Sequence, residues 1–205
     1  MLLTMLATAV AMSQTVNFDQ SITLPDGWVV GVTGHGAAKW EIVADRAAAS
    51  PPNVLRQSGE ATFCWAVSTK HPFKDGFAEV KIRPIAGKED QAGGLVWRFK
   101  DANNYYVVRA NALEGNVVLY KTVNGKRSSL QVKGRMFGYG IDTNVPEGKW
   151  SVLRVEFAGT LFTVFYEGKK LFQVEDDTFG DAGAVGVWTK ADSVTLFDDF
   201  SYGSK

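Results

Sequence analysis

The stretch Ala92-Gly-Gly-Leu-Val-Trp-Arg-Phe-Lys-Asp-Ala-Asn-Asn-Tyr-Tyr-Val-Val-Arg-Ala-Asn111 alternates apolar and polar side chains on both sides of a short polar turn. This alternation has the period of a β-strand and predicts two antiparallel strands joined as a hairpin. One apolar set is expected to face the core: Leu95, Trp97, Phe99, Tyr106, Val108 and Ala110. The opposite side would then carry Arg98, Tyr105, Arg109 and Asn111. Guanidinium groups beside an aromatic ring suit a hydroxyl-rich ligand, so this side is our candidate binding face.

Strand-like runs separated by turn residues continue along the chain. About ten are expected after residue 75, at 76–84, 93–100, 104–111, 116–123, 131–136, 149–158, 160–167, 170–174, 183–189 and 194–202. Three or four more are expected before residue 75. Pairs such as Asn124-Gly125 and Glu167-Gly168 predict tight hairpins between antiparallel strands. No window keeps a period of 3.6 over three turns, so we predict an all-β, two-sheet antiparallel β-sandwich of jelly-roll type.

Composition limits the class of protein. The chain has 205 residues, 45% of them hydrophobic, which is enough to bury the core of a single domain. Lys and Arg number 22 and Asp and Glu number 22, so neither the basic footprint of a nucleic-acid binder nor a polybasic membrane anchor is expected. Cys64 is the only cysteine, and its neighbours Phe63 and Trp65 indicate a core residue rather than a nucleophile.

The N-terminus has the pattern of an export signal. Residues 1–11 are uncharged and apolar, and Ala9-Val10-Ala11 fits a small-x-small cleavage site. The stretch is too short to span a bilayer. We expect residues 1–13 to be a signal peptide cleaved near Ala11 or Ser13, residues 14–205 to form one domain, and the protein to be secreted or periplasmic without membrane insertion. No Lys or Arg precedes the stretch, so a hydrophobic first strand is the alternative.

Several segments together carry a resemblance to a known superfamily: Gly-Gly-Leu-Val-Trp-Arg-Phe (93–99), Asp-Ala-Asn-Asn-Tyr-Tyr-Val-Val-Arg (101–109), Val-Val-Leu-Tyr-Lys (117–121), Gly-Ala-Val-Gly-Val-Trp-Thr (183–189) and Phe-Asp-Asp-Phe (197–200). In this order the chain resembles secreted bacterial concanavalin A-like (laminin G-like or glucanase) jelly-roll domains from about residue 16 to residue 202. That superfamily includes carbohydrate-binding modules, family 16 glycoside hydrolases and 3-keto-disaccharide hydrolase domains. The resemblance implies two curved antiparallel sheets, while function transfers poorly within so widespread a fold.

Two departures qualify the resemblance. The Glu-x-Asp-x-x-Glu motif of family 16 glucanases is absent from the sequence, so retaining hydrolysis by that route is not expected. The 3-keto-disaccharide hydrolase group usually has Asn-Ser-Gly-Ile where this chain has Ala-Gly-Gly-Leu (92–95), whereas residues 18–28 and 39–43 are similar to that group.

The same alternation places further charged side chains beside the candidate face. Five are expected on one polar surface: Glu79, Arg98, Arg109, Arg154 and Glu156. This surface would form either a shallow saccharide groove, with Tyr105 or Trp188 stacking on the sugar, or a solvated sheet crossed by ion pairs. Glu79 and Glu156 are the candidates for general acid and base, with surface salt bridging as the alternative.

Metal and cofactor sites have weak sequence support. His35 and His71 stand in loop-like contexts without clustered acids, so no zinc site and no cofactor is expected. Asp198-Asp199 and Glu175-Asp176-Asp177 are candidates for a structural Ca²⁺. Three functions are left open: an exported module that binds an oligo- or polysaccharide, a glycoside hydrolase of the 3-keto-disaccharide type, and a periplasmic protein-interaction scaffold.

Overall fold

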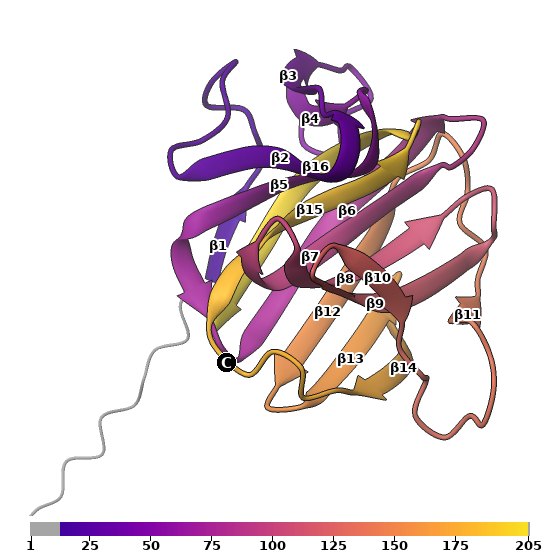
Figure 1. Cartoon of the computed structure of the whole chain (residues 1–205). Helices are drawn as coiled ribbons and strands as arrows, with labels where there is room; N and C mark the ends of the chain where they lie inside the picture. Colours follow the sequence, from indigo (N-terminus) through magenta and orange to yellow (C-terminus); the bar gives the residue numbers. More distant parts are fainter. Residues whose placement is uncertain (1–12, 205) are drawn as a thin grey trace, which may run out of the picture.

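The computed structural model describes residues 13–204, so the predicted signal peptide lies outside the described residues apart from Ser13. Within residues 13–204, sixteen strands form two antiparallel sheets. The two sheets stack on each other (Figure 1). In spatial order, sheet A contains β14 (Lys169–Glu175), β13 (Leu161–Tyr166), β12 (Ser151–Ala158), β6 (Gly76–Ala86), β16 (Val194–Ser204), β4 (Asn53–Gln57) and β3 (Trp40–Ala44), with β1 (Ser13–Val16) paired to β16. Sheet B contains β10 (Lys126–Ser129), β9 (Asn116–Val123), β8 (Asn104–Asn111), β7 (Ala92–Asp101), β15 (Gly183–Ala191), β5 (Glu60–Phe73) and β2 (Trp28–Ala37), with β11 (Ile141–Asp142) paired to β9. The predicted all-β sandwich is confirmed, and residues 13–204 contain no helix that could span a membrane.

The strand prediction differs from the structure in two regions. Residues 131–136 are irregular, and the strand beside β9 is β10 instead. Asn124 and Gly125 both have positive φ, 50° and 78°, so the chain reverses within two residues and pairs with β9 at once. Residues 13–75 contain five strands, β1 to β5, rather than three or four. His35 and His71 lie in β2 and β5 rather than in loops.

The main core lies between the sheets, and Trp97 is fully buried within it. Its ring stacks on Tyr106 at 5.4 Å and meets Phe162 edge-on at 5.3 Å, contacts worth about 1 kcal/mol each beyond area burial. Cys64 is fully buried, and burial raises the pKa of its thiol to about 11, although a hydrogen bond with Thr189 acts to lower this pKa. It is therefore a core residue, as predicted.

Sheet B is apolar on both faces. Residues that alternate with the main-core positions pack together on its outer side: Phe63, Trp65, Val67, Ala92, Val96, Phe99, Tyr105, Val107, Val118, Tyr120, Ala184 and Trp188. We call this set the aromatic face. Phe99 was predicted to point into the main core, but a β-bulge interrupts β7 after Trp97, with Arg98 at φ 45°, and turns Phe99 to the outer side.

Candidate binding groove

Arg127 shows how strongly sheet B is curved. It lies on β10 at one edge of the sheet, and β5 is five positions further across. In a flat sheet these strands would be about 24 Å apart. The guanidinium carbon of Arg127 nevertheless lies 4.7 Å from the ring centroid of Phe63 on β5 and 4.1 Å from that of Tyr120 on β9. The outer side of sheet B is therefore strongly concave, and Arg127 reaches across it; we call this concave side the groove.

Aromatic rings fill the floor of this groove. Trp188 packs against Phe63 with ring centroids 5.3 Å apart, and Tyr105 stacks on Phe99 at 5.3 Å. The Tyr105 hydroxyl is hydrogen-bonded to the Thr33 hydroxyl at 2.9 Å. Trp188 and Tyr105 share the face that the sequence predicted for them, but both are fully buried. Their rings are therefore packed in the floor of the groove and are not accessible for stacking on a ligand.

Arg109 organises a polar cluster at one end of the groove. Its guanidinium, 1% exposed, donates hydrogen bonds to Glu114 at 2.6 Å, to the Tyr120 hydroxyl at 3.0 Å and to the Tyr139 hydroxyl at 3.3 Å. It also donates to the side-chain oxygen of Asn116. Because a buried guanidinium needs partners for its donors, these contacts fix the position of the charge.

Gly94 leaves the space that Arg109 needs. It pairs with Arg109 on β8 and with Trp188 on β15. A Cβ at position 94 would lie 3.0 Å from the Arg109 Cβ and 2.5 Å from the carbonyl oxygen of Val108. Any side chain here would therefore push β8 and β7 apart.

The polar cluster continues through Asn111 to the neighbouring strand. The Asn111 amide donates to Asp90 and, at 3.3 Å, to Glu114, and Asp90 also accepts a hydrogen bond from the Lys190 ammonium group. Asp192 holds the loop that carries Asp90, since its carboxylate accepts backbone hydrogen bonds at 2.6 to 3.2 Å from Lys88, Glu89 and Asp90. The result is a continuous network from Lys190 to Tyr139.

A depression of about 510 Å³ opens where this network ends. Its lining residues come from β2, β5, β15 and the loop before β7: His35, Gly36, Glu60, Ala61, Thr62, Glu89, Lys190 and Ala191. Lys190 belongs to both the lining and the network. The depression therefore gives solvent access to the polar end of the groove.

Tyr139 lies at the other end of this network from Lys190, and its ring is partly exposed. It lies in the irregular segment between β10 and β11 and is 46% exposed, and two other large apolar side chains of the segment, Met136 and Phe137, are more than 80% exposed. Its hydroxyl bonds to that of Tyr120, with the two rings edge-on at 6.0 Å. A half-exposed amphipathic ring whose hydroxyl is held by hydrogen bonds suits contact with a sugar.

The electrostatics keep this cluster in one protonation state at neutral pH. Burial raises the pKa of Tyr120 well above its ordinary value, despite the opposing charge of Arg109, and the hydrogen bond with Tyr139 adds to the rise. Burial would also raise the pKa of Glu114, but the charge and hydrogen bonds of Arg109 outweigh it and lower that pKa. Tyr120 therefore stays protonated and Glu114 ionised.

Arg98 does not lie with Arg109, contrary to the prediction. The bulge turns its side chain toward one end of the sandwich, where its guanidinium lies over Phe162 of the main core. It donates to the carbonyl groups of Lys74 at 3.0 Å, Phe179 at 2.7 Å and Gly159 at 2.6 Å. Arg98 thus joins three loops, while Tyr105, Arg109, Asn111 and Trp188 share the groove.

Glu79, Arg154 and Glu156 lie on the outer side of sheet A, so the predicted single polar surface is wrong. Arg154 donates to Glu79 at 3.4 Å and to Glu156 at 3.0 Å, and its guanidinium lies 4.0 Å from the centroid of the Phe77 ring. The alternation along each strand correctly predicted that these side chains point away from the main core. However, β6 and β12 belong to sheet A, whereas β8 belongs to sheet B. This arrangement is the ion-paired sheet that the sequence also allowed.

The acidic pairs considered for Ca²⁺ are engaged by donors of the chain itself. Asp198 accepts backbone hydrogen bonds from Ser50 at 2.7 Å and Asp199 at 2.8 Å, and Asp199 pairs with Lys81 at 2.6 Å. Asp176 pairs with Lys121 at 2.7 Å. No group of three or more His, Cys, Asp or Glu side chains within residues 13–204 is arranged to hold a metal ion. The carboxylates of Asp198, Asp199 and Asp176 are thus paired with donors of the chain itself, and the structural Ca²⁺ stays a prediction.

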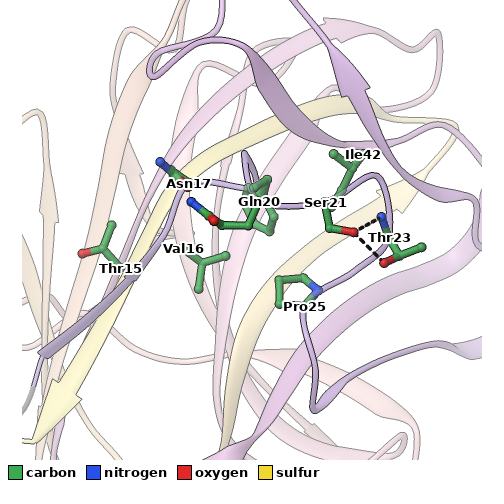
Figure 2. A pocket seen from close by; sticks show the side chains of 9 residues that line it. Thr15, Val16, Asn17, Gln20, Ser21, Thr23, Pro25 and Ile42 are labelled. Carbon is green, nitrogen blue, oxygen red and sulfur yellow. Dashed lines mark hydrogen bonds between the residues drawn. The ribbon is translucent and has the colours of Figure 1, made fainter.

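A separate cavity of about 220 Å³ lies beside the segment that follows β1 (Figure 2). It is bordered by residues such as Val16, Pro25 and Ile42, and the hydroxyls of Ser21 and Thr23 bond to each other at 2.8 Å. None of the described residues that line it carries a charge. It lacks the polar cluster that distinguishes the groove.

Sequence reasoning did not propose any of the four side-chain partners of Arg109 as site residues: Glu114, Asn116, Tyr120 and Tyr139. It also did not propose Asp90, Arg127 and Lys190, which lie elsewhere along the groove. For Asn116 and Tyr120 a signal was present, since they alternate with Val117 and Leu119 along β9 and so share the face of Arg109. Tyr139 and Arg127 reach the groove only through the irregular loop and the sheet curvature, which no local pattern encodes.

Two sheets of this order and curvature define the concanavalin A-like jelly-roll class of β-sandwich. No family model and no curated protein matches the sequence. Among solved structures, the chain is similar to the carbohydrate-binding module CBM66 from Bacillus subtilis, with a TM-score of 0.68, 21% identity, and coverage of 87% of this chain and 96% of that one. It is also similar to the cellulose-induced protein Cip1, with a TM-score of 0.68, 13% identity, and coverage of 95% and 97%. A Bacillus licheniformis β-glucanase matches with a TM-score of 0.57, 10% identity, and coverage of 97% and 100%. These similarities establish the fold.

Proposed function

We propose that the protein binds an oligo- or polysaccharide at the polar end of the groove. The observation that carries this proposal is the buried Arg109 cluster, which ends in the half-exposed ring of Tyr139 on one side and in the Lys190 depression on the other. Buried, hydrogen-bonded polar groups beside an accessible hollow are typical of sites that orient a small polar ligand. The similarity in fold to a carbohydrate-binding module supports this choice of ligand.

The chemistry of the rim fits sugar hydroxyls. Each hydroxyl both donates and accepts, so it matches a carboxylate such as Glu114, which is 38% exposed, and an ammonium group such as Lys190, which is 25% exposed. Arg109 does not need to touch the ligand, because its role is to hold Glu114 and Tyr139 in position. The exposed face of Tyr139 supplies the apolar contact.

Calorimetry on hits from a glycan array tests the proposal. We expect Tyr139→Ala to weaken saccharide binding about two- to tenfold, since stacking on one ring is worth about 0.5–1.5 kcal/mol. Ile22→Ala is the control, because Ile22 is 84% exposed in the segment before β2. Absence of binding to every saccharide would overturn the proposal, and capture of a protein partner instead would favour the scaffold hypothesis.

A second candidate function is hydrolysis of a glycosidic bond in the same depression. Two exposed carboxylates, Glu60 and Glu89, border it beside His35, and glycoside hydrolysis usually uses two carboxyl groups. Glu79 and Glu156, the pair nominated from sequence, lie on the other sheet with Arg154. Incubation with 3-keto-disaccharides would release monosaccharide, and Glu60→Gln or Glu89→Gln would abolish release. No release would leave binding as the function.

We also propose export, on the strength of the apolar residues 1–11 and the Ala9-Val10-Ala11 pattern. Mass spectrometry of protein recovered from a bacterial host should find a mature chain that begins near residue 12 or 14, in the periplasm or medium. An intact N-terminus on cytoplasmic protein would contradict export.

A further inference from the structure

The guanidinium of Arg127 spans the groove but makes no polar contact with other described residues. It lies over three rings, at 4.1 Å from the Tyr120 centroid, 4.7 Å from Phe63 and 5.5 Å from Trp188. No ion pair or side-chain hydrogen bond within residues 13–204 involves it, and its buried Nη1 is without a hydrogen-bond acceptor there. Cation–π contacts hold it in place.

The other cations at the groove differ from Arg127 in this respect. Arg109 pairs with Glu114, and Lys190 pairs with Asp90. Among the described cations of this face, Arg127 alone adds a positive charge without a carboxylate to neutralise it. A half-buried guanidinium among rings is poorly hydrated, so an anion brought to it is attracted more strongly than it would be in water.

From this arrangement we propose that the saccharide bound in the groove is acidic, and that Arg127 binds the carboxylate of a uronic acid unit. This inference rests on the proposed saccharide-binding function and specifies its ligand. Because Nη1 is buried against the rings, the ligand carboxylate would accept two parallel charge-assisted hydrogen bonds from the Nε and Nη2 side of the planar guanidinium. The unit would meet Arg127 through its carboxylate while neighbouring units reach Tyr139 and the Lys190 depression.

Lys126 provides a matched control for Arg127. It is the preceding residue on β10, so its side chain alternates to the other side of the strand, and it is exposed. Lys126→Gln and Arg127→Gln therefore remove the same charge from the same strand, one away from the groove and one inside it. An unspecific effect of net charge would be equal in the two variants.

The experiment is isothermal titration calorimetry of the full chain with an acidic oligosaccharide and with its neutral, carboxyl-reduced counterpart. Oligogalacturonate and the corresponding oligogalactan form such a pair. We expect the wild type to bind the acidic oligomer at least about tenfold more tightly. Arg127→Gln should remove this preference because it weakens binding of the acidic oligomer far more than binding of the neutral one, and Lys126→Gln should retain the preference.

The outcomes separate this inference from the proposed function. Equal affinity of the wild type for both oligomers would overturn the acidic ligand while the saccharide site stands. Binding of neither oligomer, together with no hit on a wider glycan array, would overturn both. A thermal melt of Arg127→Gln checks folding, and the more conservative Arg127→Lys should retain part of the preference if the variant with Gln is unstable.

Discussion

Arg109 and Glu114 form an ion pair of 2.6 Å across the end of the β8–β9 hairpin, with the guanidinium 1% exposed and the carboxylate 38% exposed. One partner is buried and the other is open to solvent. Loss of the carboxylate therefore leaves a buried charge with fewer partners. The carboxylate also accepts hydrogen bonds from Asn111 and Asn116, but its exposure leaves it within reach of a ligand.

Glu114→Gln should lower the free energy of unfolding by about 1–2 kcal/mol at pH 7, because Arg109 loses its charged partner. The pKa of Glu114 is lowered in the folded protein, so the stability from this pair is present above the ordinary pKa of 4.5 and is lost as pH falls further. The difference between wild type and variant should therefore shrink below about pH 4 in urea unfolding. A difference that stays constant from pH 7 to pH 3 would contradict this.

Arg98→Met should destabilise the fold without changing saccharide affinity. The variant keeps most of the apolar stem of Arg98 but leaves the carbonyl groups of Lys74, Gly159 and Phe179 without their donor. The Phe179 carbonyl loses its donor in a buried position, whereas Lys74 and Gly159 are exposed and their carbonyl groups can bond to water. We therefore expect a loss of about 2 kcal/mol in chemical unfolding. Calorimetry at a temperature where the variant is folded should give the affinity of the wild type. A selective loss of affinity would restore Arg98 to the binding site.

Glu79→Gln should change stability by less than about 1 kcal/mol, since its pair with Arg154 lies on the partly exposed outer side of sheet A. Saccharide binding and any turnover should be unaffected, because this sheet lies on the other side of the main core from the groove. Thermal melts and the glycoside assay check both points. Loss of turnover with an unchanged melting temperature would instead assign catalysis to Glu79.

The fold was predictable from sequence because the alternation of apolar and polar side chains along a strand is a local property. The side chains of β8 alternate without interruption, so the inward set, Tyr106 and Val108, and the outward set, Tyr105 and Arg109, were both correct. The alternation predicted the wrong side for Phe99 on β7. The bulge at Arg98 adds one residue to the strand, so the side chains after it point to the opposite side of the sheet. A bulge depends on what the neighbouring strands and loops offer, here three carbonyl groups, and these lie far away in sequence.

The position of some candidate site residues could not be predicted from local sequence patterns. Arg154 and Arg109 both point away from the main core, yet they lie on different sheets, because sheet membership depends on the order of strands in space. Arg127 was not named because β10 is short and polar, and only the curvature of sheet B brings it over Tyr120 and Phe63. Contacts of this kind are set by tertiary structure.

Asp198 should make the stability of the protein rise on mild acidification. Its side chain is fully buried, and burial raises its pKa to about 6, despite the backbone hydrogen bonds from Ser50 and Asp199, while the charges of Asp199 and Asp19 add to the rise. The folded protein therefore takes up this proton before the unfolded chain does, so stability gained from protonation appears as pH falls from about 7 toward 4.

Asp198→Asn removes the titration. The free energy of unfolding of the wild type, relative to the variant, should rise by about 2 kcal/mol over that range. Asp26→Asn, at a carboxylate 97% exposed, is the control and should show no such trend. A wild type that loses stability relative to Asp198→Asn on acidification would show that the folded protein holds Asp198 ionised.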